Sequence, residues 1–217
     1  EALEKGGALG WGQIDAGFFR RPEDWRERMR LYFNEIDRRD YWHGAYKRMD
    51  VLRREGYVRL ERYINHHQTY LLTLAGYRLL FSRGRLVAKG FRPELREGYV
   101  DHELAVAGVG LILEEGGIAR KVLSHRQLYA KREREQRSRP SLVRPDIWIA
   151  DKEQPCAVEV ELTQKSAARY QNLWEEYRHA MPRGGKVLYL TGWDGLRDTL
   201  LKQANDCRFP LFYAATL

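Results

Sequence analysis

The chain has 217 residues, 43% of them hydrophobic and 12% aromatic, a composition that fits a folded globular protein and excludes a largely disordered one. No apolar run is long enough to cross a bilayer and we find no secretory signal, so the sequence predicts a cytoplasmic protein. The two cysteines, Cys156 and Cys207, lack the spacing of a metal or redox motif and are expected to be small buried residues. The length is enough for one large domain or two small ones.

The net charge of +8 is concentrated in two zones. Residues 41–92 contain 11 Lys or Arg against 3 Asp or Glu, and residues 120–144 contain 9 against 2, so the rest of the chain carries a net charge of −7. Concentrated positive charge favours a polyanionic partner such as DNA, because each phosphate that a protein neutralises releases counterions. A soluble basic protein with no such partner is the alternative.

The first part of the chain, up to about residue 56, is predicted to be helical. Residues 9–19 form a short helix, and Pro22 opens a second one with two acidic residues in its first turn, where they are favourable. From residue 41 the pattern is clearer, because apolar residues recur at helical spacing on one face and polar residues on the other. The apolar positions are Trp42, Ala45, Met49 and Leu52, and the polar positions are His43, Lys47, Asp50 and Arg54. Gly56 ends this helix.

A hairpin is predicted after this basic helix. Residues 57–63 form a β-type run, a polar turn occupies residues 65–68, and a second run covers residues 69–72. Thr73 then caps a helix that reaches residue 80. The tandem histidines of the turn are interpreted as solvated side chains, because no further metal ligand is near them in the sequence.

This succession of helices, a basic amphipathic helix and a polar-tipped hairpin resembles a winged helix-turn-helix. The resemblance is carried by RMDVLRREGYV at residues 48–58 and YLLTLAG at residues 70–76. It implies that residues 1–82 bind duplex DNA, with the helix before the hairpin in the major groove and the hairpin against the backbone. The implied groove residues are His43, Lys47, Arg48 and Arg54, and the implied wing residues are Arg59, Arg62, His66 and His67. Docking onto a partner protein is the alternative.

The second half of the chain begins with a predicted linker at residues 83–100, which is rich in Gly, Arg and Pro. Asp101 then caps an apolar helix that ends at Gly116–Gly117, followed by a strand near residues 119–123 and a highly charged loop at residues 131–140. The remaining predicted elements are strands within residues 144–149 and 156–165, a helix at 166–179 with Leu173 and Tyr177 facing inward, a strand at 186–191, a helix at 196–204 and a strand at 209–214.

Three carboxylates meet in the hairpin predicted for residues 144–165. Its turn brings Asp146 on the first strand beside Glu159 and Glu161 on the second, and the two glutamates leave the same face because they are two residues apart. Their neighbours in the strand are apolar, which indicates burial, and buried acids need a positive partner. A divalent cation such as Mg²⁺ commonly fills that role. The alternative is that the glutamates line the polar face of a half-buried strand.

The order helix, three strands, helix, strand also carries a resemblance to a nuclease fold. With RPD at residues 144–146 and EVE at residues 159–161, residues 101–217 resemble the restriction-endonuclease-like PD-(D/E)XK group. The resemblance implies an α/β (α+β) domain with an αβββαβ core and a mixed sheet.

In that group the acid of the Pro-Asp pair and the first acid of the third strand bind metal, which implies Mg²⁺ or Mn²⁺ at Asp146 and Glu159. Glu161 stands where the group usually has a lysine that orients the attacking water, and Lys165 is the candidate substitute. Glu103 matches a further acid that the group often contributes to the metal. The departure at Glu161 lowers the expectation of cleavage without removing it.

A winged helix joined to this fold, with DHEL at residues 101–104, also resembles the plasmid replication-relaxation proteins, which include relaxosome accessory factors. That resemblance implies a DNA-binding protein of a mobile genetic element that acts at an origin or operator and whose nuclease-like domain cleaves weakly or not at all. A Mg²⁺-dependent site-specific endonuclease is the alternative. The implied partners are double-stranded DNA, a relaxase, replication or transcription proteins, or a second copy of the chain, and no membrane.

Overall fold

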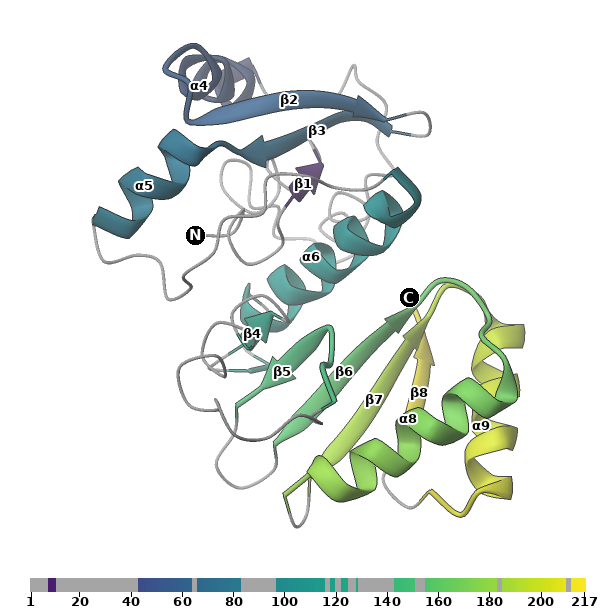
Figure 1. Cartoon of the computed structure of the whole chain (residues 1–217). Coiled ribbons are helices and arrows are strands. Elements are labelled where there is room, and N and C mark those ends of the chain that lie inside the picture. The colour runs from purple at the N-terminus through teal and green to yellow at the C-terminus, as the bar shows by residue number, and fades with distance from the viewer. Residues whose placement is uncertain are drawn as a thin grey trace. The chain divides into compact units, whose positions relative to one another are not determined.

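The structure is a computed structural model, and it describes residues 8–10, 43–63, 66–82, 97–115, 118–119, 122–124, 128, 143–150, 155–182, 185–209 and 212–217. The described residues form five α-helices and two sheets, so the predicted mixed α/β class is confirmed (Figure 1). None of the described helices is long and apolar enough to cross a membrane. The chain divides into two compact units, residues 1–118 and residues 119–217, which are taken in turn.

The first unit contains a helix, a hairpin and a second helix in immediate succession. Helix α4 (His43–Arg54) leads into strands β2 (Val58–Tyr63) and β3 (His66–Leu72), and α5 (Leu74–Ser82) follows directly. The short strand β1 (Ala8–Gly10) pairs with the other side of β3, so the sheet order is β1-β3-β2 with antiparallel neighbours. The basic helix, the hairpin and the helix after it are therefore confirmed as elements.

Local backbone chemistry explains where these elements begin and end. Gly56 has a φ of +74°, a conformation that glycine adopts without strain, and it ends α4. The hydroxyl of Thr73 accepts a hydrogen bond from the N–H of Gly76 at 3.1 Å, which makes Thr73 the N-cap of α5. The same hydroxyl donates to the carbonyl oxygen of Gly56 at 2.5 Å and lies 3.1 Å from that of Tyr57. One threonine thus joins the start of α5 to the end of α4.

Three sequence predictions for this unit need correction. His66, His67 and Gln68 lie in strand β3 and not in the turn, because the hairpin register already pairs Tyr63 with His66. Residues 9 and 10 lie in β1 and not in a helix, because their backbone pairs with β3 in the register Leu9↔Tyr70 and Gly10↔Thr69; the remainder of that predicted helix, and the one opened by Pro22, lie outside the described residues. Asp101 lies within the first turn of α6 (Val100–Glu115) and does not cap it, because the 3-10 turn η3 (Glu97–Tyr99) leads into that helix.

Helix α6 groups with the first unit by its packing. Its residues Val100 and Leu104 form a buried cluster with Leu71 of β3. The sequence predicts that this helix belongs to the second domain, which begins at residue 101. The predicted limits of the two domains and the linker, at residues 82, 100 and 101, stay predictions. Most of the predicted linker, residues 83–96, lies outside the described residues.

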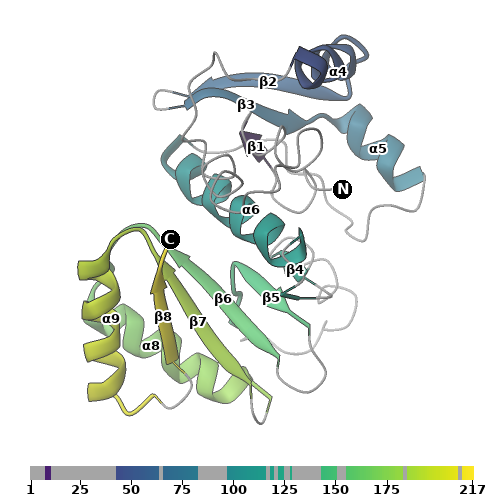
Figure 2. The same cartoon turned by 180° about the vertical axis from the view of Figure 1, so that it is seen from behind.

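The second unit is a five-stranded mixed sheet (Figures 1 and 2). Its order is β4 (Val122–Ser124), β5 (Ile147–Ile149), β6 (Cys156–Glu161), β7 (Lys186–Thr191) and β8 (Phe212–Thr216). The pairs β4–β5 and β5–β6 are antiparallel, whereas β6–β7 and β7–β8 are parallel. Parallel neighbours need a crossover, and helices α8 (Ala167–Ala180) and α9 (Asp194–Asp206) supply them.

Both crossover helices pack on one face of this sheet. Figure 1 shows α8 in front of the strands, and Figure 2, from behind, shows the strands in front of α8. The shared core consists of Val143, Ala157, Tyr170, Trp174, Tyr177, Val187, Tyr189, Leu196, Leu200, Ala204 and Phe209. Tyr177 faces inward as predicted, while Leu173 is only partly buried. Cys156 and Cys207 are half-buried free thiols, so the prediction of full burial is wrong.

Candidate functional site

Asp146 lies beside Glu159 on the neighbouring strand. Ile147 pairs with Val158 in the antiparallel register of β5 and β6, and one further step along that register sets Asp146 opposite Glu159. Residues that lie opposite each other share a face of the sheet. The Asp146 carboxylate accepts a hydrogen bond at 2.8 Å from the backbone N–H of Val160, which holds it against β6.

Glu159 is buried, and its partner comes from the helix above the sheet. The phenol of Tyr177 on α8 donates a hydrogen bond to the Glu159 carboxyl group. Burial, reinforced by the negative charge of Asp146, raises the pKa of Glu159 well above its usual value of 4.5, although the Tyr177 hydrogen bond and Lys165 oppose this shift. The environment therefore favours the protonated acid.

Glu161 has a positive partner from its own chain. It is only 3% exposed and forms an ion pair with Lys165, which lies in the short segment between β6 and α8. The backbone N–H of Lys165 donates to the phenol oxygen of Tyr170 at 3.0 Å, so the segment is anchored to α8. Lys165, which the sequence resemblance offered as a substitute for a water-orienting lysine, thus contacts Glu161. We call Asp146, Glu159, Glu161 and Lys165 the acidic site.

The acidic site offers a metal ion two carboxylates and not three. Among the described residues, no group of three or more His, Cys, Asp or Glu side chains could hold a metal ion. Mg²⁺ can be bound by one or two carboxylates together with water and phosphate oxygens. Asp146 and Glu159 could therefore supply the two carboxylates of such a site, with water and phosphate oxygens as the other ligands. Glu161 forms an ion pair with Lys165 instead.

Glu103, the additional predicted metal ligand, is half-buried on α6 in the first unit. The acidic site belongs to the second unit. The contribution of Glu103 to a metal therefore stays a prediction.

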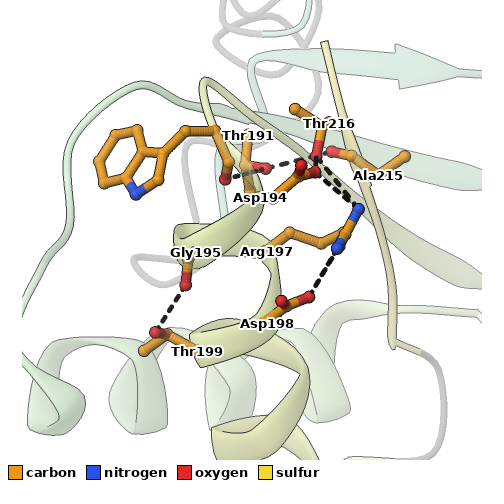
Figure 3. A network of polar contacts seen from close by, with 9 residues as sticks. Thr191, Asp194, Gly195, Arg197, Asp198, Thr199, Ala215 and Thr216 are labelled. Atoms are coloured by element: carbon orange, nitrogen blue, oxygen red, sulfur yellow. Dashed lines mark hydrogen bonds and ion pairs between the residues drawn. The ribbon is translucent and has the colours of Figure 1, made fainter.

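The carboxyl ends of the parallel strands are fixed by a polar network (Figure 3). Glu161 is in register with Thr191, and Thr191 with Thr216. The Thr191 hydroxyl lies 3.3 Å from the carbonyl oxygens of Trp193 and Ala215. The hydroxyl of Thr216 donates to Asp194 at 2.6 Å, and Arg197 joins the same carboxylate at 2.8 Å. The sheet edge that carries Glu161 is thereby braced against the start of α9.

The predicted DNA-binding residues of the first unit lie on α4 and the hairpin. Lys47, Arg48 and Arg54 are exposed on α4, whereas Arg59 on β2 forms an ion pair with Glu61 at 2.8 Å. For His43, Arg62, His66 and His67 the structure describes the backbone only: the first residue of α4, one residue of β2 and the first two of β3. We call Lys47, Arg48, Arg53 and Arg54 the basic face of α4.

From the sequence, Asp50 is predicted to lie on the polar side of its helix and Tyr177 on an inner face, but the contacts of both were missed and Tyr170 was not singled out. Asp50 pairs with both Arg53 and Arg54, and Tyr170 and Tyr177 contact the acidic site from α8. Tyr170, Trp174 and Tyr177 recur at helical spacing, which could have marked an aromatic inner face. Nothing in the sequence marks the hydrogen-bond partners of Trp174 and Tyr177, because these lie on strands 15 and 18 residues away.

The chain is thus a mixed α/β protein with an exposed basic helix in one unit and a buried acidic site in the other. Comparison with family models, with curated proteins and with solved structures finds no match to this chain. Its function is therefore argued from the residues and contacts described above.

Proposed function

We propose that this is a DNA-binding protein of a mobile genetic element, acting at an origin or operator as a relaxosome or replication accessory factor or as a regulator. In this proposal the first unit is a winged helix that reads duplex DNA, and the second is a PD-(D/E)XK-like domain that cleaves weakly or not at all. The connection with mobile elements rests on the sequence resemblance alone.

The observation that carries the DNA-binding proposal is the exposed basic face of α4 directly before the β2–β3 hairpin. Lys47 and Arg48 are exposed, and no described acidic residue forms an ion pair with either. Exposed cations on a helix are suited to phosphate contacts, because they can neutralise DNA and release counterions without first breaking an ion pair to a described acid. The hairpin adds further basic residues in the position of a wing.

The weak-cleavage proposal is supported by the acidic site. The element order of the second unit, with an antiparallel hairpin followed by parallel crossovers, suits the proposed nuclease-like core. A lysine beside the nucleophilic water is the usual means of orienting it in that group, but here Lys165 is paired with Glu161. A lysine held in an ion pair is less able to assist a water molecule.

A DNA-binding assay with two matched double variants tests the first part of the proposal. Changing Lys47 and Arg54 together to Ala should weaken duplex binding and flatten its dependence on salt by about 0.9 in the logarithmic slope for each lost phosphate contact. The control, Lys202→Ala with Arg208→Asn, removes the same charge from exposed positions of the second unit; Asn is chosen because Arg208 has a φ of 50°. Equal losses in both double variants would contradict a role for α4.

A metal-dependent endonuclease is the second candidate, favoured by the cross-strand neighbours Asp146 and Glu159. These two residues would hold a Mg²⁺ or Mn²⁺ ion, whose chemistry is to stabilise the charge that develops on the phosphate. Tyr177 would fix the orientation of the Glu159 carboxyl group. A plasmid-nicking assay separates this candidate from the first.

A further inference from the structure

We propose that Asp50 is a positioning residue that sets the DNA specificity of α4 by holding Arg53 and Arg54 away from non-specific phosphates. This inference rests on the proposed DNA binding. It adds one residue, Asp50, whose negative charge weakens that binding. An acid on the DNA-facing helix of a basic protein lowers affinity, and its contacts indicate what it contributes instead.

The geometry is that of one carboxylate shared between two arginines. Oδ1 of Asp50 lies 2.8 Å from Nη2 of Arg53, and Oδ2 lies 2.7 Å from Nη2 of Arg54. The spacings of three and four residues are those at which side chains meet on a helix. The Asp50 side chain is 24% exposed, against 50% and 68% for the two arginines.

The arginines in turn favour the ionised form of Asp50. The hydrogen bond from Arg53 is the largest cause that lowers the pKa of Asp50, and the charges of Arg54 and Arg53 add to it. The Asp50 carboxylate is ionised at neutral pH, as an aspartate that is not buried ordinarily is, and it competes with a phosphate that approaches these guanidinium groups.

The basic face of α4 is consequently divided into two halves. Lys47 and Arg48 in the middle of the helix pair with no described acid, whereas Arg53 and Arg54 in its last turn are held by Asp50. The first half can contact a phosphate without breaking an ion pair to any described acid. The second half must give up an ion pair before it can do so.

This division weakens non-specific binding more than specific binding. Exposed ion pairs are weak and screened by salt, so a well-placed acceptor can replace the Asp50 carboxylate. On a random duplex the guanine acceptors are not placed opposite Arg53 and Arg54, so these arginines contact phosphates and only exchange one anionic partner for another. A matching site can also offer the O6 and N7 acceptors of guanine, which bind an arginine in a bidentate manner. The ion pairs of Asp50 thus increase specificity because they lower the affinity for non-matching DNA.

The test compares two variants, Asp50→Asn and Glu55→Gln. Glu55 is an exposed residue just after α4, and no described residue forms an ion pair with it. Glu55→Gln therefore removes one negative charge without breaking such a pair. Dissociation constants are measured over a salt series on a duplex that the wild-type protein selects from a random library and on a scrambled duplex. Asp50→Asn should tighten binding to the scrambled duplex about three- to ten-fold, steepen its salt slope by about 1 to 2, and lower the specificity ratio. Glu55→Gln should affect the two duplexes alike.

Two further variants keep the result interpretable. Asp50→Glu keeps a carboxylate and should retain most of the specificity, and Asp50→Asn combined with Arg53→Gln and Arg54→Gln should lose the gain on the scrambled duplex. Equal effects of Asp50→Asn and Glu55→Gln, or an unchanged specificity ratio, would overturn the inference while leaving DNA binding intact. If Asp50→Asn binds both duplexes more weakly and has a lower Tm, then Asp50 stabilises helix α4 and does not set specificity. Failure of the wild-type protein to bind any duplex would remove the proposed function itself.

Discussion

Tyr177 donates a hydrogen bond to the carboxyl group of Glu159, although the two residues are 18 positions apart and both are buried. The contact joins α8 to β6 through a polar bond inside an otherwise apolar core. A buried carboxyl group with one phenol donor and an acidic neighbour has little to stabilise its charged form. The stability of the second unit should therefore depend on the protonation of this residue.

The first prediction concerns pH. Because the pKa of Glu159 is raised in the folded protein, the folded state keeps a proton that the unfolded chain releases above pH 4.5. The stabilisation linked to that proton is complete below pH 4.5 and is lost as the pH rises through the folded pKa. Glu159→Gln lacks this term, so its free energy of unfolding should improve relative to wild type by up to about 1.4 kcal/mol per pH unit in that window. Urea unfolding of both proteins over a pH series measures it, and a pH-independent difference would contradict the raised pKa.

The second prediction concerns the ion pair of Lys165 and Glu161. Lys165→Ala leaves a nearly buried carboxylate without its cation and should lower the free energy of unfolding by about 2–4 kcal/mol, somewhat below the usual range because Lys165 is 27% exposed. Glu161→Gln removes the charge itself and should cost about 1 kcal/mol. The double variant should then be more stable than Lys165→Ala alone. Equal stability of the double variant and Lys165→Ala would mean that the pair is not coupled.

The third prediction concerns cleavage. We expect slow nicking of supercoiled plasmid at most, faster with Mn²⁺ than with Mg²⁺, because Lys165 is paired with Glu161 and the site offers a metal only two carboxylates. Asp146→Asn should abolish any such nicking while DNA binding is retained. Fast Mg²⁺-dependent cutting by the wild type would favour the endonuclease candidate. Identical background in both proteins, with binding intact, would favour a pure binding protein.

The fourth prediction concerns Gly76 in α5. A Cβ added there would lie 2.2 Å from the carbonyl oxygen of Tyr57 and 2.8 Å from a methyl carbon of Leu72. Alanine gains about 1 kcal/mol in helix propensity, but the clash is with backbone and should cost about 3 kcal/mol or more. Gly76→Ala should therefore destabilise the first unit in thermal unfolding. Gly98→Ala, where nothing lies within 4 Å of the added Cβ, should change the stability little.

Local patterns predicted much of this fold. The strand at residues 186–191 is confirmed to the residue because an apolar run is bounded by glycine on both sides, and Gly56 ends α4 where its backbone takes a positive φ. Strand β1 was missed because its conformation is set by pairing with β3, some sixty residues away. Backbone order and turns are encoded locally, whereas such pairings depend on the whole fold.

The candidate site was predicted less completely than the fold, for the same physical reason. The spacing of Glu159 and Glu161 sufficed to bring both acids to one face, and the hairpin sufficed to add Asp146. The phenol donor that holds Glu159 comes from a helix 18 residues further along the chain, and no local spacing specifies that contact. The spacing of Asp50 with Arg53 and Arg54 could have indicated their ion pairs. The roles in DNA binding and metal chemistry stay predictions.

The hydroxyl of Thr73 has a consequence for the DNA binding proposed for α4. Because it bonds to the carbonyl oxygen of Gly56 at 2.5 Å, and because the N–H of Thr73 donates to the carbonyl oxygen of Tyr57 at 3.0 Å, the end of α4 is tied to the far end of the hairpin. These hydrogen bonds restrain the helix relative to the hairpin before any ligand binds. If α4 binds DNA as proposed, this restraint reduces the conformational entropy lost on binding, and affinity then depends more on how well the DNA matches the helix.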